Sequence, residues 1–117
     1  MEGMQRPGRA WIALNLEHLR HNVAALQARL PLGCQLMPVV KANAYGHGAV
    51  PIARELNSLG IRAFCVATAE EGAELRKNGV AGDILVLGFT PLEEMALARR
   101  YDLIQTAVDW EYARQLN

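Results

Sequence analysis

The sequence predicts an α/β fold in which parallel strands alternate with helices along the chain. Short apolar runs rich in Val, Ile and Leu are each followed by a longer segment in which apolar residues recur every three or four positions. This alternation is typical of βα units, and residues that favour helix N-caps stand at the junctions. About four such units follow an N-terminal strand, so we expect roughly half of an eight-stranded (β/α) barrel.

The first elements have clear boundaries. Residues 11–14 predict a short N-terminal strand, and Asn15 is a suitable N-cap for the helix that follows. Residues 35–41 predict the first strand of the barrel. A glycine-bearing loop over residues 42–48 connects this strand to a second helix, which ends at Gly60.

The next two units begin with similar signals. Residues 63–67 predict a strand, and Thr68 with Glu71 forms a capping box for the helix after it. Residues 84–87 are a continuous apolar run of the kind buried on both faces of a parallel sheet. The N-cap, N1 and N3 positions of the following helix are assigned to Thr90, Pro91 and Glu93.

The last unit is incomplete in this sequence. Residues 103–108 predict a strand, and Asp109 is an N-cap for a last helix. The sequence ends at Asn117, within this predicted helix. We therefore expect an N-terminal segment with its strand over residues 1–15 and the N-terminal half of a barrel over residues 16–117, truncated from a domain of about 250 residues. A small doubly wound sheet is the alternative, but the sequence lacks the G-x-G-x-x-G turn that such sheets use for phosphates.

Composition narrows the class of protein. Twelve Lys and Arg balance twelve Asp and Glu, and no run of like charge occurs, so nucleic acid and anionic membranes are not expected partners. No stretch approaches the ~20 apolar residues of a membrane span, and the polar start has no signal-peptide core, which favours a cytoplasmic protein. Cys34 and Cys65 lie in apolar stretches, where we expect reduced, buried thiols.

Lys41 is the most unusual residue of the pattern. It ends an apolar strand within the sequence V-V-K-A-N-A-Y-G-H-G, residues 39–48. Desolvation in a parallel sheet favours the neutral amine, which is the form that attacks a carbonyl, and reacting groups converge at the C-terminal ends of barrel strands. A lysine whose stem packs on the core and whose ammonium reaches solvent is the alternative, and spacing does not decide between them.

The segment over residues 39–48 is similar, position by position, to the cofactor-lysine motif of the alanine racemase family. Decarboxylases that use pyridoxal phosphate (PLP) in a related barrel share only K-A-N, and small PLP-homeostasis proteins lack Y-G-H-G. Residues 62–68 and 103–110 look like the racemase domain of vancomycin-resistance serine racemases. Further segments resemble the family's strands and helices over residues 10–15, 66–79 and 84–88.

The resemblance implies a PLP-binding barrel and an isomerase that racemises alanine or serine. Lys41 would hold PLP as a Schiff base and act as acid and base on one face of the substrate α-carbon. Tyr45 would donate a hydrogen bond to the cofactor phosphate, and Val39 and Leu87 would line the cofactor. His47 is expected to be a structural loop residue that donates a hydrogen bond.

The resemblance also implies that other parts of the enzyme lie outside residues 1–117. In the family, the second base is a tyrosine from the C-terminal domain of the partner subunit. The strand that corresponds to residues 11–14 belongs, in the family, to a separate C-terminal β-domain. We therefore expect a small amino-acid substrate, no turnover by the fragment alone, and a homo-oligomer, because half a barrel exposes apolar strand edges. The alternatives are a noncatalytic, self-associating barrel module and a related PLP decarboxylase.

No metal site is expected. His18 and His21 are three positions apart on a predicted helix, but no third ligand of suitable spacing follows. Glu70 and Glu71 are adjacent carboxylates that fit the start of a helix better than an acid and base pair.

Overall fold

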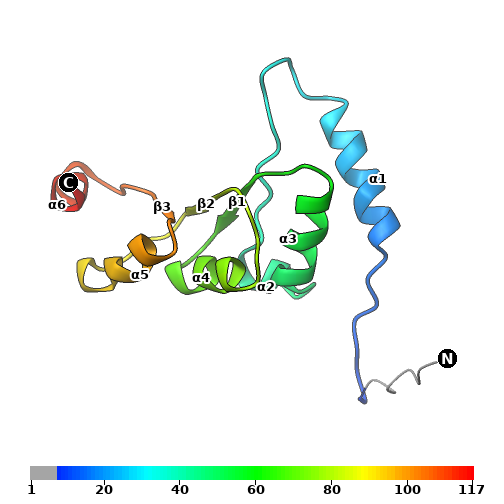
Figure 1. Cartoon of the computed structure of the whole chain (residues 1–117), viewed down its shortest axis with the longest axis horizontal. Coiled ribbons are helices and arrows are strands. Elements are labelled where there is room, and N and C mark those ends of the chain that lie inside the picture. Colours follow the sequence, from blue (N-terminus) through cyan, green and yellow to red (C-terminus); the bar gives the residue numbers. More distant parts are fainter. Residues whose placement is uncertain (1–7) are drawn as a thin grey trace.

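The structure is a computed structural model that describes residues 8–117 (Figure 1). The first seven residues of the predicted N-terminal segment therefore lie outside the described residues. In chain order, the elements are α1 (Leu16–Gln27), α2 (Lys41–Tyr45), α3 (Ala49–Ser58), β1 (Ala63–Val66), α4 (Ala69–Lys77), β2 (Asp83–Val86), η1 (Leu92–Glu94), α5 (Met95–Arg100), β3 (Ile104–Gln105) and α6 (Trp110–Leu116).

The strands form one parallel sheet in the order β1-β2-β3. Cys65 of β1 lies opposite Leu85 of β2, which in turn lies opposite Ile104 of β3. At the other edge of β1, a single parallel bridge joins Val39 to Cys65. The strands neighbour each other in the order of the sequence, with helices in the connections between them, and the prediction of a parallel α/β fold is confirmed.

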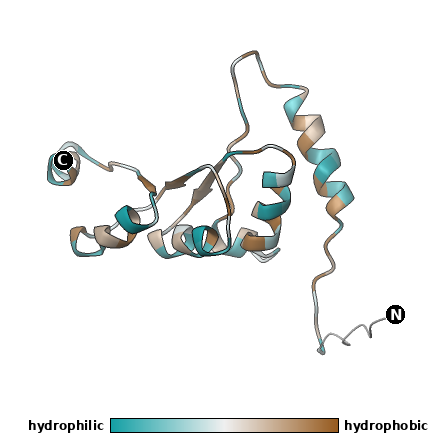
Figure 2. Ribbon diagram, in the orientation of Figure 1, coloured by the Kyte–Doolittle hydropathy of each residue, from teal (hydrophilic) through white to brown (hydrophobic). Residues whose placement is uncertain are grey.

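One side of the sheet carries the core. Figure 1 shows α3, α4 and α5 on the same side of the strands, whose residues are mostly apolar in Figure 2, with Asp83 and Gln105 as the polar exceptions. Phe64 and Val66 point to this side, as do Ile84 and Val86, and all four are fully buried. Because alternate strand residues point to opposite faces, the intervening residues face away from these helices. We call them the open face; its members are Val39, Cys65, Leu85, Leu87 and Ile104.

Three of the predicted capping residues act as expected. The Asn15 side chain accepts hydrogen bonds from two backbone amides at the start of α1, at 3.0 and 3.1 Å. Thr68 Oγ1 accepts one from the amide of Glu71 at 3.2 Å, and Asp109 Oδ1 accepts one from the amide of Tyr112 at 2.7 Å. These caps satisfy amides that have no partner within their own helices.

Thr90 does not cap a helix, so this prediction is wrong. Pro91 instead precedes the short 3₁₀ turn η1, at whose start no side chain accepts a hydrogen bond, and Glu93 lies within that turn. Thr90 is buried, and its hydroxyl donates to Gln105 Oε1 at 2.6 Å. A buried hydroxyl needs a hydrogen-bonding partner, and β3 supplies one that the local sequence could not reveal.

One strand prediction was wrong, and two others were too long. Residues 11–14 are not a strand, because no strand among the described residues pairs with them. The strand over residues 35–41 shrinks to the bridge at Val39, and Lys41 already belongs to α2. The predicted strand over residues 103–108 shortens to β3.

Helix α1 stands beside α3, apart from the sheet (Figure 1). The ion pair between Arg20 Nε and Glu55 Oε1, 2.5 Å apart, joins the two helices, and Val23 is the buried residue of α1. Hydrogen bonding to Glu55 raises the pKa of Arg20. Cys34, in the connection that follows α1, is exposed, so its predicted burial is wrong; Cys65 is buried as expected.

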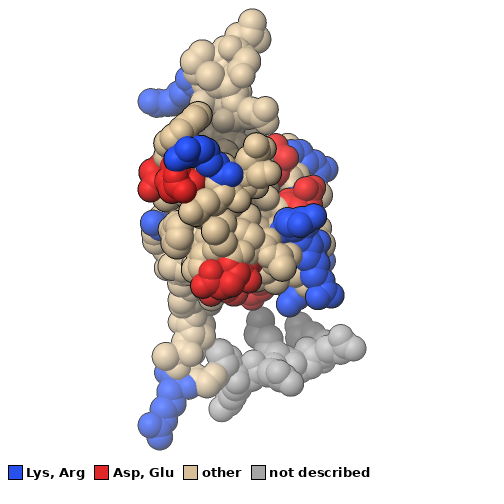
Figure 3. Space-filling view, turned by 90° about the vertical axis from the view of Figure 1, so that its left-hand side faces the viewer, with Lys and Arg blue, Asp and Glu red and all other residues tan. Residues whose placement is uncertain are grey.

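The surface carries both signs of charge. On the face shown in Figure 3, basic and acidic side chains are interspersed. Within residues 8–117, no helix combines the length and the apolar composition needed to cross a bilayer.

Gly82 and Gly79 offer a matched test of the packing at the start of β2. A Cβ at Gly82, where φ is +101°, would lie 2.2 Å from the carbonyl oxygen of Arg62, whereas at Gly79, where φ is +79°, it would meet nothing within 4 Å. We expect Gly82→Ala to lower the free energy of unfolding by about 2–4 kcal/mol, because steric overlap adds to the penalty of positive φ. Gly79→Ala should cost about 1 kcal/mol. Urea denaturation measures both, and equal losses would contradict this packing.

Candidate functional site

The backbone directly after Lys41 is left-handed. Ala42, Asn43 and Ala44 have φ/ψ of 50/46°, 54/45° and 53/46°, and Tyr45 has φ of 55°. We call residues 42–45 the left-handed turn; it makes up most of α2. Non-glycine residues visit this region at a cost of about 1–2 kcal/mol each, and normally only singly. Consecutive strained residues persist only where their surroundings fix them, and such strain concentrates at functional sites.

Backbone hydrogen bonds close the turn upon itself. The amide of Ala44 donates to the carbonyl of Val40 at 3.0 Å, and the amide of Gly46 donates to that of Ala42 at 3.2 Å. Gly46 continues the left-handed conformation with φ of 90°, which a residue without Cβ adopts at little cost. The turn is therefore a single hydrogen-bonded unit that begins at the end of the extended segment.

Two side chains secure the far end of the turn. Asn43 Oδ1 accepts a hydrogen bond from the amide of Ala49 at 2.8 Å and so caps α3, whose own N-cap residue is a glycine. His47 Nδ1 lies 2.8 Å from the carbonyl oxygen of Ala44. A carbonyl only accepts, so Nδ1 is the donor, and the predicted structural hydrogen bond of His47 is confirmed.

Glu71 secures the near end, next to Lys41. Its Oε1 accepts a hydrogen bond from the amide of Ala42 at 2.9 Å, and its Oε2 accepts one from the amide of Ala67 at 2.6 Å. In the predicted capping box, this carboxylate would bind the amide of Thr68. That half of the prediction is wrong: the carboxylate binds one residue earlier and also reaches across to the turn.

The sheet places three of the predicted site residues at its C-terminal edge. Val40, directly before Lys41, donates its amide to the carbonyl of Cys65 at 2.9 Å, and Leu87 donates its own to that of Val66 at 2.8 Å. Lys41 is half-buried. Val39 and Leu87, both on the open face, are 39% and 41% exposed.

Tyr45, the fourth predicted residue, lies at the end of the left-handed turn. Its side chain is 62% exposed. The site therefore offers a primary amine, a phenol and two apolar side chains. Glu71 and Asn43 also belong to the site, and the sequence analysis did not identify them as site residues. Asparagine in a glycine-bearing loop was a usable signal, because Asn tolerates the left-handed region better than most residues.

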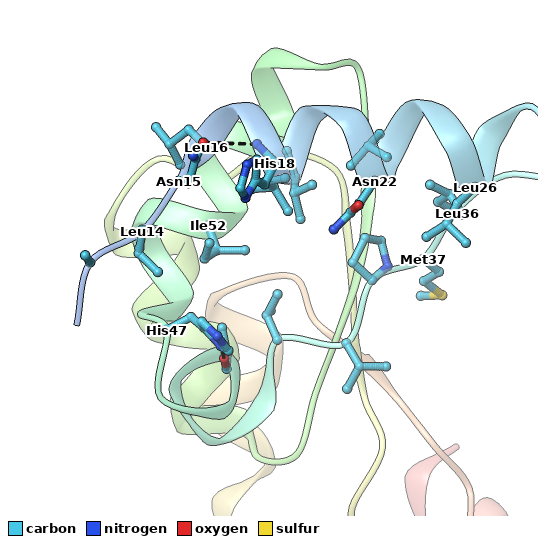
Figure 4. A pocket seen from close by; sticks show the side chains of 18 residues that line it. Leu14, Asn15, Leu16, His18, Asn22, Leu26, Leu36, Met37, His47 and Ile52 are labelled. Atoms are coloured by element: carbon cyan, nitrogen blue, oxygen red, sulfur yellow. Dashed lines mark hydrogen bonds between the residues drawn. The ribbon is translucent and has the colours of Figure 1, made fainter.

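A separate apolar cavity of about 610 Å³ lies between α1 and the rest of the molecule (Figure 4). Of the four predicted site residues, only Val39 lines it. His47 also lines it, but its Nδ1 is engaged with Ala44. Its wall further includes His18 but not His21, and within residues 8–117 no group of three or more metal-ligating side chains comes together.

Cys65 is the cysteine nearest to the predicted site. It pairs with Val39 through the parallel bridge. Burial raises the pKa of the Cys65 thiol, which keeps it protonated and unreactive. Cys65 therefore packs the sheet and is not a candidate nucleophile.

Comparisons with known proteins match this architecture. Residues 14–117 match the family model "Alanine racemase, N-terminal domain". The chain is 43% identical over 109 residues to an amino-acid racemase of Enterococcus faecalis, covering 93% of this chain and 16% of that protein. It is 45% identical over 96 residues to an alanine racemase of Carboxydothermus hydrogenoformans, covering 82% and 26%.

A solved structure agrees with both relatives. The alanine racemase of Clostridium difficile 630 in complex with cycloserine superposes with a TM-score of 0.82 and 36% identity, over 86% of this chain and 27% of that one. The chain thus spans about a quarter or less of the length of these relatives. From residue 14 onward, the chain belongs to the alanine racemase family, whose N-terminal domain it matches.

Proposed function

We propose that this chain supplies the cofactor-attaching lysine of a PLP-dependent amino-acid racemase, and that Lys41 is that lysine. The observation that carries the proposal is the position of Lys41, between the end of an extended segment of a parallel sheet and an anchored left-handed turn. Strain of this kind is maintained where a side chain must be held in one place. We further propose that residues 16–117 are the opening βα units of a (β/α) barrel, whose interior would be the open face.

The side chains present fit PLP by their chemistry. A primary amine suits the aldehyde carbon of the cofactor, a phenol suits its phosphate, and apolar side chains suit its ring. Lys41, Tyr45, Val39 and Leu87 would supply these groups in that order. Barrels usually complete a phosphate site with the loops after their seventh and eighth strands, so Tyr45 would be one donor among several.

Racemisation requires removal of the α-proton from one face of the amino acid and its return to the other. Bound PLP would supply an electron-withdrawing ring that makes the α-proton acidic. The amine of Lys41 would take up or return the proton on its own face, and the side chains of Val39 and Leu87 would keep water from the ring. The opposite face needs a second group, which we propose comes from outside residues 1–117.

The names of the relatives support a proposal for the substrate class. The proteins it resembles are named alanine racemase and amino-acid racemase, which supports a small α-amino acid such as alanine or serine. The likeness of residues 62–68 to serine racemases is the feature that favours serine. We propose no side-chain pocket, because none of the residues assigned to the site would contact that part of the substrate.

The two lysines of the chain provide a direct test of the attachment. Only Lys41 and Lys77 are present, and Lys77 lies 5.5 Å from the ring centroid of Tyr101, at the end of α4. After incubation with PLP and reduction with borohydride, peptide mapping should find the label on Lys41. Lys77→Arg should keep the label and Lys41→Arg should lose it. Label on Lys77 with Lys41 unmodified would overturn the assignment.

Self-association is the second function that the structure favours. Val39, Leu87 and Ile104 are apolar, and about two-fifths or more of each side chain is exposed on one face. Parallel sheets normally have both faces covered, so we propose that a second copy of the chain covers this one.

Sedimentation equilibrium at micromolar concentration tests this second proposal. We expect a dimer or larger species that Ile104→Glu dissociates, because a charge on the open face opposes burial. Leu92→Glu is the matched control, since Leu92 is 44% exposed and Ile104 46%, but Leu92 lies in η1, outside the sheet. A compact, cooperatively unfolding monomer would contradict self-association.

A further inference from the structure

We propose that Glu71 is a positioning residue for Lys41, holding the peptide bond that follows this lysine and thereby the backbone from which its side chain extends. The proposal rests on the proposed role of Lys41. It assigns to Glu71 a function beyond the start of α4, because one carboxylate binds amides of two separate segments.

Glu71 binds the peptide between Lys41 and Ala42. The amide that Glu71 Oε1 accepts, at 2.9 Å, belongs to this peptide. Its direction sets the ψ angle of Lys41 and the entry into the left-handed turn. Asn43 and His47 hold only the far end, through Ala49 and Ala44. Glu71 is therefore the side chain that fixes the turn at the lysine itself.

The other oxygen of the Glu71 carboxylate binds the residue that follows β1. Glu71 Oε2 accepts the amide of Ala67 at 2.6 Å, and the carbonyl of Ala67 accepts the amide of Gly88 at 3.1 Å. A continuous line of hydrogen bonds thus runs from the Lys41–Ala42 peptide through Glu71 and Ala67 to the residue after Leu87. Through these bonds, Glu71 connects the segment that carries Lys41 to the segment that carries Leu87.

Both contacts of Glu71 join a backbone amide to a carboxylate oxygen. Hydrogen bonds from amides to a carboxylate are charge-assisted and stronger than those between neutral groups. Both oxygens are used, so rotation of the carboxylate would break two bonds at once. Glu70, the preceding residue, is exposed, and its carboxylate takes part in none of the hydrogen bonds found within residues 8–117.

The test compares Glu71→Gln with Glu70→Gln by amide hydrogen exchange in the full 117-residue chain. The glutamine amide keeps the size of the side chain but has one acceptor oxygen in place of two. In Glu71→Gln we expect exchange at Ala42 to be at least about tenfold faster, the effect of losing one charge-assisted bond, while Val86 in β2 exchanges as before. Glu70→Gln should change neither amide.

A second readout concerns the lysine. Glu71→Gln should slow borohydride-trapped labelling of Lys41 by PLP about tenfold relative to Glu70→Gln. Adding Ala42→Gly should restore much of this loss, because glycine enters the left-handed region without the Cβ penalty. A purely structural role of Glu71 would not predict this rescue.

The outcomes separate the two proposals. Unchanged exchange at Ala42 in Glu71→Gln, or equal acceleration at Ala42 and Val86, would overturn the positioning role. Absence of label on Lys41 in the unaltered chain would instead contradict the proposed function, and exchange at Ala42 would still decide whether Glu71 holds the turn. Faster exchange at Ala42 alone, with slower labelling and rescue by glycine, would support the proposal.

Discussion

The left-handed turn at residues 42–45 is the constraint on which the candidate site depends. Four consecutive non-glycine residues have positive φ, a conformation that the isolated chain would leave. Contacts between the turn and residues outside it keep it there: Glu71 binds its first amide, His47 binds the carbonyl of Ala44, and Asn43 of the turn binds the amide of Ala49. These contacts tie the backbone at Lys41 to α3, to α4 and to the end of β1, so the lysine extends from a rigid base.

The two faces of the sheet differ in how far their side chains are buried. Residues that point toward α3, α4 and α5, such as Phe64 and Ile84, are fully buried and contribute to the hydrophobic core. The open face keeps apolar side chains such as Val39 and Leu87 partly exposed. A parallel sheet needs both faces covered, so this second face is available to a cofactor, to further chain or to another copy, which unites the two proposed functions.

Local signals predicted most of the fold, and long-range contacts account for the errors. The caps at Asn15, Thr68 and Asp109 could be predicted because each accepting oxygen lies within three residues of its donor. Thr90 could not, since its partner is 15 residues away on β3. The same limit hid the second half of the Glu71 contact, which spans 29 residues. Residues 39–48 indicated the family correctly but not the handedness of the turn within them.

A left-handed backbone follows Lys41 directly, and its dihedral angles can be measured in solution. Three-bond couplings and residual dipolar couplings, measured by NMR on isotopically labelled protein, report φ at Ala42, Asn43, Ala44 and Tyr45 independently of any cofactor. We expect positive φ at all four residues, in agreement with the values of 50–55° in the structure. Negative φ across Ala42 to Ala44 would describe an ordinary right-handed turn and would show that the left-handed turn is wrong.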